Sequence, residues 1–156
     1  MNELTYSPTK KDNFLSRSPN PEPSYDREKV NYTSTAALYD AVFQNAFHAM
    51  YIETGDGLIL KFNEKFCKLF GYSDAELATI EKEDLFETGE NAFINFLDEI
   101  TDKGIAKEEI TAIKKSGQRF PCRISSVIYQ SDFGDKRAMN TLVDISNDLS
   151  ARWNFD

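Results

Sequence analysis

Two short apolar runs separated by glycines mark the middle of the chain. The runs cover residues 49–52 and 58–62, and Gly55-Asp56-Gly57 lies between them. Glycine adopts the positive φ angles that a tight hairpin turn requires at no steric cost. The pattern therefore predicts two short antiparallel strands joined by this turn.

The apolar spacing then changes from that of a strand to that of a helix. Asn63 can accept a hydrogen bond from the free N–H groups of a helix that begins there, and Gly71 is suited to end it. Ser73 and Glu76 have the spacing of a capping box, which predicts a second short helix. One face of the first helix is apolar and consists of Phe66, Leu69 and Phe70.

The second half of the chain begins with helical signals and continues with alternation. Residues 80–85 form an acidic segment with one expected helical turn, and residues 89–102 form a longer amphipathic helix closed by Gly104. From Phe120 to Ile128 apolar and polar residues alternate, which predicts a strand with one buried face. Residues 105–114 and 138–145 are expected to pair with it across turns at 116–117 and 132–135. The chain therefore predicts five strands.

These motifs, in this order and at this spacing, resemble those of a PAS domain, a sensory module of signalling proteins. The resemblance covers residues 34–147 and rests on Gly57, Asn63, Leu69-Phe70-Gly71-Tyr72-Ser73, Glu76-Leu77, Lys114-Lys115-Ser116-Gly117 and Asp144-Ile145-Ser146. It implies an α+β fold: a five-stranded antiparallel sheet with short helices and one longer helix on one face. The expected domain occupies residues 49–147, and residues 148–156 are a C-terminal stub or the start of an output linker.

The N-terminal region divides into two parts. Residues 1–33 contain four of the five prolines and predict a flexible leader. Residues 34–48 predict a flanking helix with two neighbouring apolar stripes. PAS domains commonly dimerise through a helix in this position, so we expect a homodimer whose candidate interface is Leu38, Tyr39, Val42, Phe43 and Ala46. Alternatively, the sheet and leader cover both stripes within one chain.

The composition of the chain argues against several classes of binding partner. The net charge is −8, and no Lys/Arg-rich run exceeds a pair, which argues against binding nucleic acid. No apolar run approaches the length of a membrane span, and the first 30 residues lack a secretory signal core, so we expect a soluble, cytoplasmic protein. Cys67 and Cys122 are 55 residues apart and form no metal-binding motif, so neither zinc nor a disulfide is indicated.

Residues for catalysis are scarce. His48 is the single histidine of the sequence, and no nucleophile, base and orienting group occur in a recognisable arrangement. Haem-binding PAS domains carry their ligand histidine on the long helix, which has none here. Flavin-binding light-oxygen-voltage domains carry a reactive cysteine in an Asn-Cys-Arg-Phe-Leu motif that this sequence lacks. These two differences argue against haem and against covalent flavin, so the cofactor stays unknown.

A cavity between the sheet and the long helix is the expected ligand site, because such concave apolar sites bind small molecules. The alternative is that the many phenylalanines fill it and nothing binds. The candidate lining is Met50, Ile52, Leu60, Phe62, Phe66, Phe70, Phe93, Phe96, Leu97, Ile100, Phe120, Cys122, Ile124 and Ser126.

The resemblance implies a non-enzymatic sensory or protein-interaction module that relays a signal through its termini, with Asp144 and Ser146 at the output. The effector is either a protein partner in trans or part of a longer chain, such as a histidine kinase of a two-component system or a transcriptional regulator. One alternative is a ligand-free dimerisation module. Another is a small isomerase or hydrolase, which would need a buried carboxylate or tyrosine, whereas strand alternation places Glu53 outward.

Overall fold

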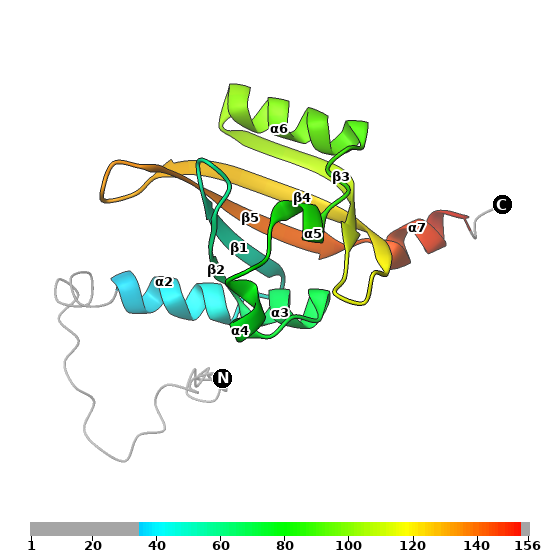
Figure 1. Ribbon diagram of the computed structural model, residues 1–156, viewed down its shortest axis with the longest axis horizontal. Coiled ribbons are helices and arrows are strands. Elements are labelled where there is room, and N and C mark those ends of the chain that lie inside the picture. Colours follow the sequence, from blue (N-terminus) through cyan, green and yellow to red (C-terminus); the bar gives the residue numbers. More distant parts are fainter. Residues whose placement is uncertain (1–34, 154–156) are drawn as a thin grey trace, which may run out of the picture. The chain divides into compact units, whose positions relative to one another are not determined.

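The computed structural model describes residues 35–153, so the expected leader over residues 1–33 lies outside the described residues. The fold described below is that of the unit that begins at Tyr39. Five strands form one antiparallel sheet in the order β2-β1-β5-β4-β3 (Figure 1). They are β1 (Ala49–Thr54), β2 (Ile59–Phe62), β3 (Ile105–Ile113), β4 (Arg119–Gln130) and β5 (Lys136–Asp144). The predicted five-stranded sheet is confirmed.

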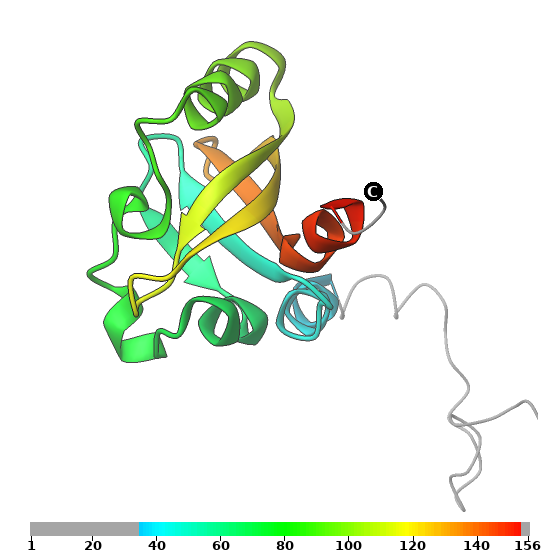
Figure 2. The same cartoon turned by 90° about the vertical axis from the view of Figure 1, so that its right-hand side faces the viewer.

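Six described helices accompany the sheet. They are α2 (Thr35–Gln44), α3 (Glu64–Phe70), α4 (Asp74–Leu77), α5 (Lys82–Leu85), α6 (Asn91–Lys103) and α7 (Ser146–Trp153). Helices α3 to α6 all connect β2 to β3. Figures 1 and 2 show α6 running along β3 on one face of the sheet.

The short helices begin and end where the sequence predicts. The Asn63 side chain accepts a hydrogen bond from the Phe66 N–H at 3.0 Å, and Gly71 ends α3 with a φ of 84°. Ser73 and Glu76 form the expected capping box of α4. These local signals suffice because each satisfies backbone groups that the helix itself leaves free.

Helix α6 begins at Asn91, two residues later than expected. Its N-cap residue is Glu90, whose carboxylate accepts hydrogen bonds from the backbone N–H of Thr111 at 2.6 Å and from the Thr111 hydroxyl at 2.9 Å. This pairing fastens the start of α6 to β3. Gly104 ends the helix in the left-handed conformation, as predicted.

Aromatic side chains fill much of the space between the sheet and the helices. The Phe66 ring lies 4.6 Å from the Phe70 ring and 5.6 Å from the Tyr51 ring, measured between centroids. The Phe70 ring lies 5.7 Å from that of Phe120 on β4. Rings at these separations exclude water and hold α3 against β1 and β4.

The expected inward phase is wrong for β1, whereas in β2 it holds for Phe62 but not for Leu60. Tyr51 belongs to the core, whereas Met50 is only half-buried and Ile52 is buried outside the core cluster. In β2 the register shifts opposite Ile52 and Glu53, so Leu60 is exposed. A continuous apolar run such as residues 49–52 does not reveal which alternate residues face the core.

Candidate functional site

The inner face of the sheet carries small and polar residues at one end. Antiparallel pairing aligns Tyr51, Asn140 and Ser126 across β1, β5 and β4, and continues to Ala106 on β3. The next aligned row is Glu53, Ala138 and Ile128. Paired residues share one face of the sheet. Ser126 and Ala138 in these rows are small, and a space remains between this part of the sheet and α6.

That space is a cavity of about 260 Å³. Apolar side chains of α6 form one wall, and the ends of β1, β4 and β5 form the other. Its lining is Glu53, Thr54, Gly55, Lys82, Phe96, Leu97, Ile100, Thr101, Ser126, Ile128, Lys136, Arg137 and Ala138. The volume is that of about nine water molecules, which suits a small organic molecule and not a large cofactor.

Glu53 is the centre of a buried polar cluster on the cavity wall. Its side chain forms an ion pair with Lys82, with 2.9 Å between Oε2 and Nζ. Asn140 Nδ2 donates a long hydrogen bond to Glu53 Oε1 at 3.4 Å. Despite the ion pair, Glu53 Oε2 accepts no well-aligned hydrogen bond within the described residues, and neither does Asn140 Oδ1. Buried acceptors without donors are rare in folded proteins and raise the free energy of the folded state.

Lys82 reaches the cavity from α5, a helix of a single turn. A Cβ atom placed on Gly57 would lie 3.6 Å from Lys82 Cε and Nζ, so the lysine packs over the β1–β2 turn. A larger, more open depression of about 420 Å³ over that turn shares Gly55 and Lys82 with the cavity. Lys82, which pairs with Glu53, therefore lies between the cavity and this outer depression.

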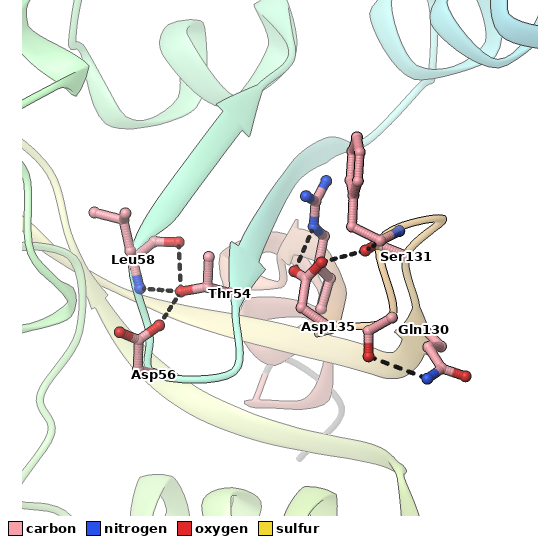
Figure 3. A network of polar contacts seen from close by, with 9 residues as sticks. Thr54, Asp56, Leu58, Gln130, Ser131 and Asp135 are labelled. Carbon is pink, nitrogen blue, oxygen red and sulfur yellow. Dashed lines mark hydrogen bonds and ion pairs between the residues drawn. The ribbon is translucent and has the colours of Figure 1, made fainter.

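Side-chain hydrogen bonds hold the two turns that border the cavity (Figure 3). Thr54 Oγ1 accepts a hydrogen bond from the Leu58 N–H at 3.0 Å and donates one to the Asp56 carboxylate. In the β4–β5 turn, Ser131 donates to Asp135, whose other oxygen pairs with Arg137 at 3.0 Å. The backbone of Gly55 also donates to the carbonyl of Lys136 at 3.0 Å, which joins the two turns.

The structure distributes the predicted lining over two regions. Phe96, Leu97, Ile100 and Ser126 do line the cavity. Phe66, Phe70, Phe93, Phe120, Cys122 and Ile124 are buried in the filled part of the core, and Phe62 packs against it. Met50, Ile52 and Leu60 belong to neither region. Ligand binding by any of them stays a prediction.

Sequence reasoning missed the polar half of the site. Glu53, expected outward, is 7% exposed. Lys82 and Ala138, which line the cavity, and Asn140, which bonds to Glu53, were not predicted as site residues. The signal for Glu53 was present, because it shares its alternation phase with Tyr51. Asn140 and Lys82 join the site only through long-range pairing, which no local pattern indicates.

The remaining chemistry-bearing residues do not extend the site. Burial raises the pKa of the Cys122 thiol to about 12, so that this thiol stays protonated. His48 is exposed, and its backbone carbonyl accepts a hydrogen bond from Asn63 Nδ2 at 2.9 Å. Over the described range, no cluster of three or more potential metal ligands occurs. Nor does any described helix have the length and apolarity to cross a membrane.

The family model of the PAS domain matches residues 48–147, which is well over half of the chain. The chain belongs to the PAS-domain family. The match begins just before β1 and ends just after β5, so it contains the cavity and every strand. No curated protein sequence is significantly similar to the chain.

Solved PAS domains share this fold at low sequence identity. The PAS domain of a two-component sensor histidine kinase is 14% identical, covers 75% of this chain and 98% of its own, with a TM-score of 0.62. A PAS domain from Colwellia psychrerythraea is 19% identical, with coverages of 72% and 98% and a TM-score of 0.63. The PAS domain of a LuxR-family transcriptional regulator from Burkholderia thailandensis, solved in complex with ethanol, is 17% identical, with coverages of 69% and 97% and a TM-score of 0.59.

The predicted interface and output residues lie at the two ends of this PAS domain. Leu38 and Val42 are each 61% exposed, and Tyr39 is partly exposed, whereas Phe43 is buried and Ala46 half-buried. Phe43 is therefore covered within the chain and does not suit the interface assigned to it.

At the other end, α7 follows β5 almost at once. The Asp144 carboxylate accepts hydrogen bonds from the Ser146 N–H at 2.9 Å and from the Ser146 hydroxyl at 2.5 Å. This acidic side chain lies at the first turn of α7, where a negative charge favours the helix.

Proposed function

We propose that this PAS domain is a non-enzymatic sensory module that binds a small molecule between α6 and the sheet and relays its presence through α7. One observation carries the proposal: a cavity lies between α6 and one end of the sheet, and a buried polar cluster around Glu53 borders it. A ligand there would replace interactions that the folded chain leaves unmade. The ethanol complex of the Burkholderia PAS domain supports a ligand role for the fold.

The buried carboxylate that an enzyme would need is present, but its surroundings favour binding. Glu53 already pairs with Lys82 at 2.9 Å and with Asn140. The cavity lining contains no histidine, cysteine or tyrosine that could act as its partner in acid–base chemistry. The isomerase or hydrolase alternative would have to use Lys82 as the second group, and the ion pair with Glu53 favours the charged form of both side chains.

The path from cavity to output runs along β5. Ala138 lines the cavity at one end of this strand, and Asp144 ends the strand beside the start of α7. A ligand shifts such an element only when it binds two conformations with different affinity. We propose that the effector is contacted through α7, either in trans or in a longer chain. Cytoplasmic location stays a prediction.

Native mass spectrometry of the full chain, purified without added ligand, tests the cavity. We expect a bound small molecule or, if it dissociates during purification, recovery of binding when the protein is incubated with cell extract. Ala138→Leu fills the cavity and should abolish the adduct, whereas Ala75→Leu at an exposed position of α4 should leave it unchanged. A wild-type protein that stays free of any adduct under both conditions contradicts ligand sensing and favours the ligand-free dimerisation module.

The same measurement tests the proposed homodimer. Val42 is exposed on α2, so Val42→Glu should convert a dimer into a monomer because it places a charge in an apolar contact. Phe133→Glu, at a position that is more open to solvent in the β4–β5 turn, serves as the control. A wild-type monomer at all concentrations would show that the exposed stripe of α2 has another role.

A further inference from the structure

The chemical class of the ligand follows from the charges on the cavity wall. We infer that the cavity binds an uncharged molecule with an apolar body and one hydrogen-bond donor, such as a hydroxyl group. This donor forms a hydrogen bond to the Glu53 carboxylate. This inference rests on the proposed function, because it concerns the same cavity. It goes further in that it separates neutral from charged ligands.

The need for a donor follows from the unmade hydrogen bond of Glu53. This side chain is more than nine-tenths buried and lines the cavity, and its Oε2 atom accepts no aligned hydrogen bond within the described residues. A carboxylate oxygen can accept more than one strong hydrogen bond, and the Lys82 ammonium, although 2.9 Å from Oε2, forms no aligned hydrogen bond with it, so a donor placed in the cavity could supply one. A purely apolar ligand would instead bury this oxygen still further from water.

The ion pair with Lys82 excludes a charged ligand. The Glu53 and Lys82 charges lie 2.9 Å apart and neutralise one another. A ligand carboxylate would be attracted by the cationic side chains on the cavity wall, but at Glu53 it would meet a like charge and has no proton to donate. A ligand ammonium would lie beside Lys82 and near Lys136 and Arg137, which also border the cavity. Either charge would need to break the existing pair to gain a partner, which is costly in a buried site.

The size of the cavity and its apolar walls limit the size of the apolar part of the ligand. Phe96, Leu97 and Ile100 from α6 face Ile128 on β4 across a volume of about 260 Å³. A single ring or a chain of similar size fits this volume, with its polar end toward Glu53. Apolar walls with one or two placed polar groups are typical of small-molecule sites.

Four probes that share one benzene ring test the class. Benzyl alcohol is a neutral donor, toluene has no donor, benzoate is an anion and benzylammonium is a cation. Each is titrated into the full chain, with binding followed by NMR through the methyl groups of Leu97, Ile100 and Ile128. Benzyl alcohol should bind about tenfold more tightly than each of the other three, the effect of one hydrogen bond to a charged acceptor.

Two variants should exchange the preference between charge classes. Glu53→Gln leaves Lys82 without its counter-charge, so benzoate should become the tightest probe. Lys82→Met leaves Glu53 unpaired, so benzylammonium should become the tightest, and this variant decides the question if Glu53→Gln does not fold. Glu109→Gln removes a carboxylate that pairs with Arg123 away from the cavity and should keep every affinity within about twofold.

Three results would overturn the assignment. Toluene binding as tightly as benzyl alcohol would show that the donor has no role. Benzoate or benzylammonium binding best to the wild-type chain would show that the ligand is charged, while the cavity itself would remain a ligand site. Absence of any methyl shift with all four probes would overturn both the ligand class and the proposed binding of small molecules.

Discussion

The two ends of the inner sheet face differ although the same three strands build both. At the filled end β1 carries Ala49, β4 carries Ile124 and β5 carries Leu142, and aromatic rings of α3 cover them. Two rows further along, the same strands carry Glu53, Ile128 and Ala138 and border the cavity. The filled end supplies the packing that stabilises the fold, and this allows the other end to remain hollow.

Two asparagines make the contrast sharper. Asn63, between β2 and α3, uses its whole side chain: Oδ1 accepts from Met50 N–H at 2.9 Å and from Phe66 N–H, and Nδ2 donates to Phe43 and His48 carbonyls. The side chain of Asn140, next to Glu53, makes one long hydrogen bond and leaves Oδ1 without a partner among the residues that the structure describes. A fully satisfied polar group stabilises a fold, whereas an unsatisfied one marks a candidate for function.

The largest effect is expected from removing a ring at the filled end. Phe66 is fully buried between Phe62 and Phe70, so Phe66→Ala should lower the free energy of unfolding by about 3–5 kcal/mol, measured by urea denaturation. Phe133→Ala, at an exposed turn position, should change it by less than about 0.5 kcal/mol. A loss below about 1 kcal/mol for Phe66→Ala would show that the filled end is not the stabilising half.

The asparagine pair provides a second contrast. Asn63→Ala removes four hydrogen bonds and the cap of α3, and should lower the free energy of unfolding by about 2–3 kcal/mol. Asn140→Ala should cost less than about 1 kcal/mol, because it also removes a buried acceptor that has no donor. Equal costs at the two positions would mean that Asn140 is satisfied in solution, for example by bound water.

An alanine pair should change stability in opposite directions. Ala112 is fully buried opposite Phe120, so Ala112→Val should overpack the filled end and lower the free energy of unfolding by about 1–3 kcal/mol. Ala138→Val extends into the cavity and should raise the same free energy by up to about 1 kcal/mol. Thermal denaturation of both variants measures this, and destabilisation by Ala138→Val would indicate that the cavity is already filled.

The effect that is absent at neutral pH concerns a thiol at the filled end and appears only in alkali. The folded-state pKa of Cys122, about 12, lies above its ordinary value of 9.0 because burial penalises the thiolate. Its contribution to stability is therefore complete below about pH 9 and falls by up to about 1.4 kcal/mol per pH unit as the pH rises toward 12. Urea denaturation between pH 8 and pH 10.5 should show a shallower decline for Cys122→Ala, and parallel slopes would contradict this burial effect.

Residues that act on their immediate neighbours were predicted well. Asn63, Gly71, Ser73 and Gly104 mark helix ends in the structure as they do in the sequence, because caps and left-handed positions depend on a few adjacent residues. The inward phase of β1 and the site residue on it, Glu53, were not predicted, because Met50, Tyr51 and Ile52 are all apolar and give no alternation. The β2 bulge that exposes Leu60 likewise depends on pairing with β1.

The sequence by itself determined the order of the strands, several helix ends and the family, because spacing of apolar residues and turn chemistry are local properties. Only the tertiary structure decided that Glu53, Lys82 and Asn140 meet, since they come from β1, α5 and β5 and are brought together by strand pairing and by packing of α5 over the first turn. A missing hydrogen bond of a carboxylate costs free energy only when the carboxylate is buried. Burial results from the packing of the helices on the sheet, so no single segment of the sequence reveals it.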